Sequence, residues 1–264
     1  MKKNKAKIIA VIQARLGSKR LPKKALIKIH DRTLIEWIAH RLSFAREIDQ
    51  VILATSDTAE NKVLVDLAEK IKLPYFCGSE TDLIQRLNGA AKKFRADAIV
   101  RITGDCPFVD PTLVDKLVKV YRDSNSNVEY VSNISPPTFP DGLDVEVIST
   151  NLLDRLDREV TDPLRREWLT TTILENPEKF NTINVFSEEN LSHLRLTVDY
   201  PEDLVLVAEI FSRLRHHQPF FTLKDILKLF KENPSLPDIN RKWVDTEIIN
   251  NIRSKAFHDL KGKL

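Results

Sequence analysis

The chain has 264 residues, of which 42% are hydrophobic and 30% are charged, so it is not a disordered chain and can bury a full core. Its 41 basic and 38 acidic residues nearly balance at a formal charge of +3, which gives no general case for nucleic-acid binding. Two cysteines far apart, Cys77 and Cys106, favour a reduced cytoplasmic protein over a disulfide scaffold or a zinc site.

Short apolar runs alternate with amphipathic stretches in the first half of the chain. The runs are bounded by turn residues, which predicts strands at Ile8–Gln13, Val51–Thr55, Tyr75–Cys77 and Ala98–Thr103. The first run breaks at Gln13 and Arg15, too early for a signal peptide or a membrane span. We therefore expect a cytoplasmic location.

Helices are predicted between these strands. Capping-box spacing at Thr33–Glu36 and Asp57–Glu60 opens amphipathic runs to Arg46 and Ile71, and further helices are expected over 81–94 and 111–122. Strands alternating with helices predict an α/β protein with a mostly parallel central sheet and helices on both faces. Ligands of such sheets bind at the carboxyl ends of the strands.

The pattern changes after residue 125. Alternating Leu143, Val145 and Val147 predict an extended segment whose other face carries Asp144 and Glu146. The remaining elements expected are helical stretches near 152 and 165, a strand over 194–198, a helix over 201–213 with proline in its first turn, and an amphipathic helix in the tail after 221.

A basic loop follows the first predicted strand. It contains Arg15, Gly17, Ser18, Lys19, Arg20, Lys23 and Lys24. At the carboxyl edge of a sheet, a glycine lets the backbone approach a ligand, and successive N–H groups can point at an anion. The loop suits a nucleoside triphosphate, although neither standard phosphate-loop pattern is present. A solvated basic turn is the alternative reading, and Lys19 is expected to face solvent.

Two predicted strands end on carboxylates. One strand delivers Thr103 and Asp105 to the edge that holds the basic loop, and the strand over 194–198 ends on Asp199. Carboxylates repel a triphosphate unless a divalent cation lies between them, and Mg²⁺ binds one or two carboxylates together with phosphate oxygens. Each aspartate alone is typical of a cap or turn, but together with the basic loop they predict a Mg²⁺ site.

Six motifs occur in order along the chain: QARLGSKRLPKKAL, ATSD, GSETD, RITGDCPFVDP, PDGLDVEV and LRLTVDYPEDL. Together they resemble the cytidylyltransferase family of the spore-coat polysaccharide type, which is related to the synthetases of CMP-activated sugar acids. The resemblance covers essentially the whole chain. It implies a Rossmann-like nucleotide-diphospho-sugar transferase (GT-A-like) fold in one domain over 1–264, with a dimerisation and acceptor segment at 130–170 and a helical tail at 215–264.

The resemblance also implies an activity and its participants. These are Mg²⁺-dependent transfer of CMP from CTP to a sugar or sugar acid, release of pyrophosphate, a role in polysaccharide or glycoconjugate biosynthesis, and a homodimer that binds neither nucleic acid nor membrane. Two other readings stay open. One is a sugar-phosphate nucleotidyltransferase that uses another nucleoside triphosphate. The other is a catalytically silent nucleotide-binding or nucleic-acid-binding protein, against which Asp105 and Asp199 argue.

Roles for individual residues follow from the same resemblance. The catalytic residues implied are Arg15, Arg20, Lys24 and Asp105, and the metal ligands are Asp105 and Asp199. The nucleotide-binding residues implied are Gln13, Ala14, Arg15, Gly17, Ser18, Arg20, Lys24, Ala54, Thr55, Gly78, Ser79, Asp82 and Thr103. The acceptor-binding residues implied are Asp141, Gly142, Asp144, Glu146 and Trp168.

The sequence departs from the family pattern at two positions. Residues 21–24 read LPKK where the family has LPGK, and Trp168 stands where relatives commonly carry a histidine. An indole offers one hydrogen-bond donor and a broad apolar face, so Trp168 is expected either to stack on a sugar or to fill the core beside its helix.

Overall fold

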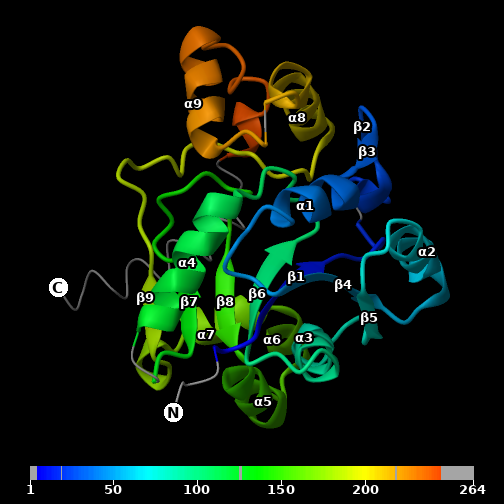
Figure 1. Cartoon of the computed structure of the whole chain (residues 1–264), viewed down its shortest axis with the longest axis vertical. Helices are drawn as coiled ribbons and strands as arrows, with labels where there is room; N and C mark the ends of the chain where they lie inside the picture. The colour runs from blue at the N-terminus through cyan, green and yellow to red at the C-terminus, as the bar shows by residue number, and fades with distance from the viewer. Residues whose placement is uncertain (1–4, 19, 125–126, 218, 245–264) are drawn as a thin grey trace.

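A mostly parallel sheet runs through the centre of the molecule in the computed structural model, which describes residues 5–18, 20–124, 127–217 and 219–244 (Figure 1). Within these residues the sheet has seven strands in the order β5-β4-β1-β6-β8-β7-β9. Their bounds are β1 (Ile8–Gln13), β4 (Gln50–Ser56), β5 (Tyr75–Gly78), β6 (Ala98–Thr103), β7 (Tyr130–Ser132), β8 (Glu146–Ser149) and β9 (Thr182–Asn184). Strand β8 is antiparallel to both of its neighbours, and the other pairs are parallel. The predicted α/β class is confirmed.

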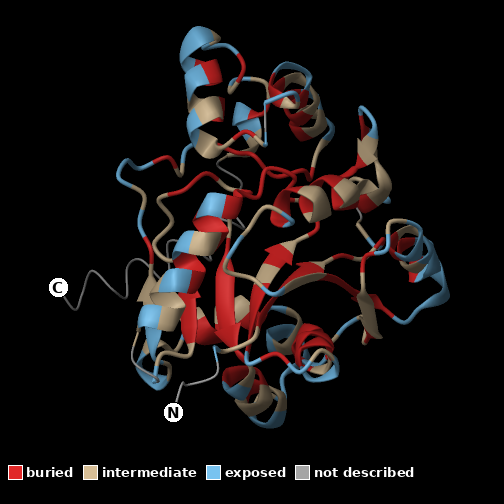
Figure 2. Ribbon diagram, viewed as in Figure 1, coloured by how far each residue is buried: buried red, intermediate tan, exposed pale blue. Residues whose placement is uncertain are grey.

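Helices cover both faces of this sheet, because its strands are apolar on both sides (Figure 2). Ile8, Ala10 and Ile12 of β1 pack on one face, and Ile9 and Val11 pack on the other. The first face is covered by α1 (Leu34–Leu42), α2 (Lys62–Lys70) and α4 (Pro111–Asp123), whereas α8 (Pro201–Leu214) and α9 (Leu223–Glu232) extend the same apolar cluster above the sheet (Figure 1). The second is covered by α3 (Leu83–Lys93), α5 (Thr150–Glu159) and α7 (Leu169–Leu174).

The shorter elements connect these layers. Strands β2 (Lys28–Ile29) and β3 (Arg32–Thr33) form a separate hairpin before α1. Helix α6 (Pro163–Glu167) precedes α7, and short 3₁₀ turns lie at Lys24–Leu26, Ala59–Asn61, Pro177–Lys179 and Arg241–Trp243. No helix of the described ranges is long and apolar enough to cross a bilayer.

Most predicted elements are present, and one capping box is confirmed. The Thr33 hydroxyl accepts from the Glu36 amide at 3.2 Å, while the Thr33 amide donates to the Glu36 carboxylate at 2.7 Å, although α1 ends before the predicted Arg46. The capping box predicted at Asp57–Glu60 is wrong, because a 3₁₀ turn intervenes and α2 begins at Lys62. The Asn61 side chain at that start is engaged elsewhere, since its Oδ1 accepts from the Leu16 amide of the basic loop at 2.8 Å.

The predicted strand over 194–198 is also wrong. Its backbone pairs with loops instead of a strand: the Leu196 amide donates to the Asp141 carbonyl at 2.7 Å, and the Val198 amide donates to the Asp105 carbonyl at 2.9 Å. The segment still leads into Asp199 and α8. The tail helix is confirmed as α9, whereas residues 245–264 of the predicted tail, and Lys19, lie outside the described residues.

The turn at Gly142 presses against this extended segment. Its φ is +98°, and a Cβ atom there would lie 2.4 Å from the Thr197 nitrogen and 2.5 Å from the Leu196 carbonyl carbon. Only glycine tolerates both the positive φ and this close approach of two backbones. The turn therefore fixes the Asp141 loop against the segment that carries Asp199.

We predict that Gly142→Ala lowers the free energy of unfolding by about 3 kcal/mol or more, because the new methyl group meets backbone atoms that cannot yield. Urea denaturation measures the change. Gly17→Ala is the matched control, since a Cβ at Gly17 would meet only Glu80 Oε1 at 3.5 Å, and its effect should stay within about 1 kcal/mol. Equal effects of the two substitutions would contradict the prediction.

Candidate active site

The carboxyl ends of β1, β4, β5 and β6 meet at one edge of the sheet. Gln13 at the end of β1 lies opposite Ala54 of β4 on one side and Thr103 of β6 on the other. Ser56 at the end of β4 lies opposite Gly78 of β5. The parallel register thus brings four of the predicted nucleotide-binding positions to this edge: Gln13, Ala54, Gly78 and Thr103.

The ammonium of Lys24 lies between two carboxylates at this edge. Its Nζ is 2.6 Å from Asp105 Oδ2 and 2.7 Å from Asp199 Oδ1, and it also donates to the Val198 carbonyl at 3.0 Å. The Lys24 side chain is only 14% exposed. The structure therefore brings together the basic loop and both carboxylates that the sequence predicts as metal ligands.

Each carboxylate has one oxygen held from behind and one facing Lys24. Asp105 Oδ1 accepts from the Thr103 hydroxyl at 2.5 Å. Asp199 Oδ2 is 3.1 Å from Arg195 Nη2, while its Oδ1 is also 2.7 Å from Arg20 Nη2. Asp105 Oδ2 and Asp199 Oδ1 thus face the same point, which we call the cation position.

The protonation states at the cation position follow from these contacts. Burial raises the pKa of Asp105, but attraction to Lys24 and hydrogen bonds from Lys24 and Thr103 outweigh burial and leave this pKa below its ordinary value. Burial and the negative charge of Asp105 raise the pKa of Asp199. The positive charges of Lys24 and Arg20 lower it by more, so the pKa of Asp199 is below its ordinary value. Burial lowers the pKa of Lys24, but both aspartates outweigh burial and raise it. At neutral pH all three groups are charged.

The charges around this position leave a net negative charge. Three cations, Lys24, Arg20 and Arg195, are paired with four carboxylates, Asp105, Asp141, Asp199 and Asp203, so these seven side chains sum to one negative charge. Among the described residues no group of three or more His, Cys, Asp or Glu side chains is arranged to hold a metal ion. A cation here would need substrate oxygens beside Asp105 and Asp199, which is how Mg²⁺ usually binds at phosphate sites.

Arg15 connects the basic loop to two other segments. Its Nη2 is 2.5 Å from Glu167 Oε1 at the end of α6, and its Nη1 donates to the Glu80 carbonyl at 3.0 Å. Ser18 at the turn of the loop accepts from the Leu21 amide at 3.3 Å. Glu167 directly precedes Trp168, and the sequence analysis assigned no role to it.

Arg86 is a second residue that the sequence analysis missed. It is buried on α3, and its Nη1 donates to the carbonyl groups of Ser79 and Glu80, the latter at 3.3 Å. Burial lowers its pKa to about 10, and repulsion from Arg15 adds to the effect of burial. The two carbonyl contacts fix the loop after β5. Because Arg86 sits inside an amphipathic helix pattern, no local signal distinguishes it from a surface arginine.

The other predicted nucleotide-binding residues have local roles. Asp82 caps α3, where its Oδ1 accepts from the Gln85 amide at 2.9 Å, and its Oδ2 is 2.6 Å from Arg166 Nε. Ala54 and Thr55 are buried in β4, and Thr55 Oγ1 has no hydrogen-bond partner within the described ranges. The Ala14 amide continues the pairing by donating to the Ala54 carbonyl at 3.2 Å.

The predicted acceptor residues occupy different environments. Asp141 Oδ2 is 2.7 Å from Arg195 Nη1. Burial raises the pKa of the Cys106 thiol, and the negative charges of Asp105, Asp144 and Asp141 raise it further.

Glu146 and Trp168 differ most from the expectation. Glu146 is buried and forms an ion pair with Arg101 and accepts hydrogen bonds from the Tyr130 and Thr170 hydroxyls, both at 2.7 Å. Its placement does not favour acceptor binding. Trp168 lies between α6 and α7 and is 49% exposed, so the reading in which it fills the core is wrong.

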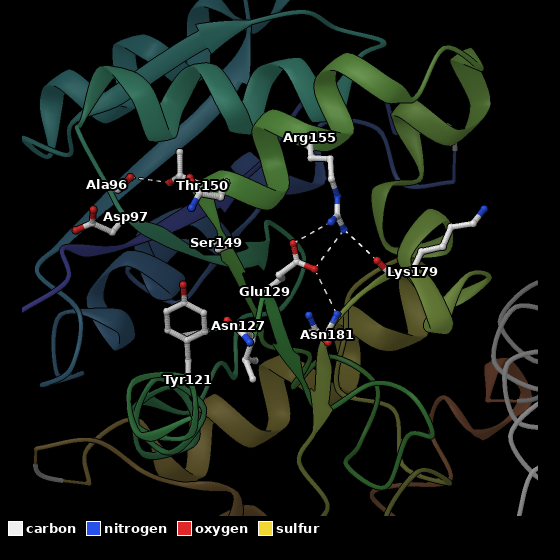
Figure 3. A pocket seen from close by; sticks show the side chains of 12 residues that line it. Ala96, Asp97, Tyr121, Asn127, Glu129, Ser149, Thr150, Arg155, Lys179 and Asn181 are labelled. Carbon is white, nitrogen blue, oxygen red and sulfur yellow. Dashed lines mark hydrogen bonds and ion pairs between the residues drawn. The ribbon is translucent and has the colours of Figure 1, made fainter. Parts of the chain in front are cut away.

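A separate pocket of about 560 Å³ opens at the opposite edge of the sheet (Figure 3). It lies before β6 and β7, where Asp97 and Glu129 line it. Glu129 points toward Arg155, which is 3.1 Å away. Among the described residues that line this pocket, none belongs to the predicted site.

Several known proteins are similar to this chain over most of its length. An uncharacterized protein of Methanocaldococcus jannaschii is 32% identical over 97% of this chain and 99% of its own. The spore coat polysaccharide biosynthesis protein SpsF of Bacillus subtilis is 28% identical over 86% and 95% of the two chains. A 3-deoxy-manno-octulosonate cytidylyltransferase of Geobacter metallireducens is 26% identical over 79% and 99%. The solved structure of a cytidylyltransferase from Leptospira borgpetersenii superposes with a TM-score of 0.84 at 33% identity, over 88% and 97% of the two chains.

The fold and the charged edge of the sheet therefore define a nucleotidyltransferase, an enzyme that transfers a nucleotide group. Residues 9–233 match the cytidylyltransferase family, and the chain belongs to that family. The resemblance stated from the six sequence motifs is confirmed.

We predict that Lys24→Met lowers the free energy of unfolding by about 3 kcal/mol at pH 7, because it leaves the carboxylates of Asp105 and Asp199, 23% and 11% exposed, facing each other without a cation between them. In the natural protein both carboxylates have lowered pKa values, so their stabilisation is present above about pH 4 and is lost as the pH falls through the folded-state pKa values. In the variant, protonation of one aspartate relieves the repulsion, and the deficit should shrink toward pH 5.

Urea denaturation of both proteins at pH 7 and pH 5 measures this difference. Lys62→Met is the control, since its side chain is 76% exposed and its Nζ lies 3.9 Å from Asp66, so its effect should stay within about 0.5 kcal/mol at both pH values. A deficit in Lys24→Met that does not change with pH would show that repulsion between the carboxylates is not its cause.

Proposed function

We propose that this enzyme transfers CMP from CTP to a hydroxyl group of a sugar or sugar acid, with Mg²⁺ bound, and releases pyrophosphate. The observation that carries the proposal is the cluster in which Lys24 lies between Asp105 and Asp199. Membership of the cytidylyltransferase family supports CTP as the donor. The names of the Bacillus and Geobacter relatives support a sugar acid or polysaccharide precursor as the acceptor class.

The triphosphate would bind to the basic loop. Arg15, Arg20 and Lys24 come from one short stretch, and each is paired with a carboxylate of the protein. Phosphate oxygens can replace these partners because they carry the same charge and accept the same hydrogen bonds. The backbone of residues 13–18, Thr103 and the Gly78–Asp82 loop held by Arg86 complete the proposed nucleotide site.

Asp105 and Asp199 would hold Mg²⁺ through the oxygens that face the cation position. Both are ionised, and the cluster carries a net negative charge, so the residues present fit a divalent cation. A bound Mg²⁺ would neutralise phosphate charge and stabilise the departing pyrophosphate. Because Lys24 occupies the position between the two carboxylates, its ammonium must move to other acceptors, and the triphosphate supplies them.

In the reaction, the hydroxyl oxygen of the acceptor forms a bond to the α-phosphorus of CTP. The bond from that phosphorus to the oxygen bridging the α- and β-phosphates breaks, pyrophosphate leaves with the electron pair, and the hydroxyl proton is released. Arg15, Arg20 and Lys24 would hold the phosphates and stabilise the charge that develops on them. Positioning and charge stabilisation suffice for such an in-line displacement, without a nucleophile from the protein.

The acceptor would lie beside the loop that contains Asp141, Gly142 and Asp144. Half-exposed Trp168 can stack on an acceptor, because its ring is open to solvent.

The expected cytoplasmic location and the homodimer through residues 130–170 stay predictions, and sedimentation would test the dimer.

Pyrophosphate release tests the proposal. CTP, UTP, GTP and ATP are each supplied with Mg²⁺ and a panel of ulosonic acids and sugar phosphates, and calorimetry measures CTP binding in parallel. We expect release from CTP with a ulosonic acid, and a changed acceptor profile in Trp168→His. Release from another nucleotide with a sugar phosphate would favour the alternative enzyme, and CTP binding without turnover would favour a silent relative. Failure of the folded protein to bind CTP would overturn the proposal.

We also predict that Asp105→Asn reduces turnover on the order of 100-fold or more, because the amide keeps the shape of the side chain and loses the charge that faces the cation position. Steady-state pyrophosphate release measures the loss, and thermal unfolding checks that the variant is folded. The control is Asp66→Asn on the exposed surface of α2, which should retain full activity. Full activity of folded Asp105→Asn would exclude Asp105 as a metal ligand.

A further inference from the structure

A buried guanidinium lies directly behind Asp199. The side chain of Arg195 is 1% exposed, and its Nη2 is 3.1 Å from Asp199 Oδ2. Its Nη1 is 2.7 Å from Asp141 Oδ2, and its Nε is 2.9 Å from Asp203 Oδ1. All three nitrogens of Arg195 therefore bind carboxylates, and two of these carboxylates belong to the proposed metal and acceptor sites.

The partners of Arg195 are fixed in turn. Asp203 is fully buried, and its Oδ2 accepts from the Asp199 and Tyr200 amides at 2.8 Å and 2.9 Å, which secures the start of α8. Asn240 Nδ2 donates to Asp203 Oδ1 at 2.8 Å and to the Arg195 carbonyl at 3.1 Å. Asn240 lies beyond residue 233, where the match to the family ends.

The neighbouring part of the C-terminal segment packs on the same turn. The ring of Trp243 stacks on Tyr200, with centroids 3.6 Å apart, and its Nε1 donates to Glu202 at 2.9 Å. The Arg20 guanidinium lies 5.3 Å from the centre of the Tyr200 ring. Residues 240–243 thus contact the turn between Asp199 and α8.

The contacts of Asp199 divide between its two oxygens. Oδ2 binds Arg195, while Oδ1 binds Lys24 and Arg20. Rotation of the carboxylate would break the charge-assisted hydrogen bond that Arg195 Nη2 donates to Asp199 Oδ2, and this Nη2, which also donates to Asp203 Oδ2 at 3.0 Å, is fixed in place. Arg195 therefore holds Asp199 in the one orientation that presents Oδ1 to the cation position.

We propose that Arg195 is a positioning residue of the active site, which aims Asp199 Oδ1 at the bound divalent cation, and that Asn240 of the C-terminal segment holds Arg195 and Asp203 in place. This inference rests on the proposed function, because it takes the cation to be a metal bound together with CTP. The same guanidinium anchors Asp141, so the metal site and the acceptor loop share one support.

Metal binding tests the inference without a turnover assay. Mn²⁺ replaces Mg²⁺, and electron paramagnetic resonance measures free Mn²⁺ in the presence of saturating CTP. In Arg195→Lys we expect the Mn²⁺ affinity to fall about 10-fold or more, because an ammonium keeps the charge but cannot hold three carboxylates as a planar fork does. Affinity for CTP without metal should change by less than about twofold, since among the described residues Arg195 meets the basic loop only through shared neighbours, Asp199 and Tyr200.

Arg122→Lys is the matched control. Arg122 is also a largely buried arginine, 13% exposed, and it donates to the Ala6 and Glu47 carbonyls at the opposite edge of the sheet. Both Lys variants should melt at lower temperature, but only Arg195→Lys should lose Mn²⁺ affinity. Asn240→Ala should weaken Mn²⁺ binding in the same direction by about threefold, because it removes the two hydrogen bonds that Asn240 donates to Asp203 and to the Arg195 carbonyl, neither of which touches the metal site directly.

Folded Arg195→Lys that binds Mn²⁺ as the natural protein does would overturn the inference. If Arg195→Lys does not fold, Asn240→Ala decides, and unchanged Mn²⁺ affinity in that variant overturns it equally. If the natural protein with CTP binds no Mn²⁺, the proposed function fails, and this inference fails with it. That outcome is measured on the natural protein alone, before any variant is compared.

Discussion

The site depends on one interaction, the placement of the Lys24 ammonium between the carboxylates of Asp105 and Asp199. These residues lie 81 and 175 positions from Lys24 along the chain, so three distant segments meet at one buried charge. Two carboxylates so close together repel each other unless a cation lies between them. In the protein without substrate Lys24 supplies that cation, and in the proposed complex a metal takes over the position.

The other cations at this edge of the sheet are also paired with carboxylates of the protein. Arg15 is paired with Glu167, and Arg20 is paired with Asp199. The basic loop is therefore held in place by anions of the protein before any triphosphate arrives. Binding then exchanges one set of anionic oxygens for another, which avoids ordering a flexible loop and keeps the cations directed at the phosphates. A solvated basic turn would not have these partners.

A second set of contacts lies behind those that the triphosphate would replace, and substrate binding leaves this second set unchanged. Thr103 holds Asp105 from one side, and Arg195 with Asp203 and Asn240 holds Asp199 from the other. Glycine at 142 lets the loop that contains Asp141 pass against the segment that carries Arg195. Such supporting contacts commonly decide how well a metal site is formed, although they touch neither metal nor substrate.

The sequence by itself determined the four parallel strands that carry the site, but it predicted neither β7 nor β9. Apolar runs bounded by turns predicted β1, β4, β5 and β6 within a residue of their bounds, and the basic loop and both aspartates were placed at the correct edge. The strands and the basic loop are local features of the sequence. The position of the loop and the aspartates follows because the carboxyl ends of parallel strands lie at the same edge of a sheet. Resemblance then supplied the family.

Only the tertiary structure decided how the side chains of the site are used. The capping box expected at Asp57–Glu60 is absent because a 3₁₀ turn precedes α2, and the strand expected at 194–198 pairs with loops instead. Arg86, Arg195 and Asn240 gave no signal in the sequence, since each lies in an ordinary pattern of charged and apolar residues. Their roles arise from partners distant in the chain, and a periodic pattern carries no information about which distant group fills a hydrogen bond.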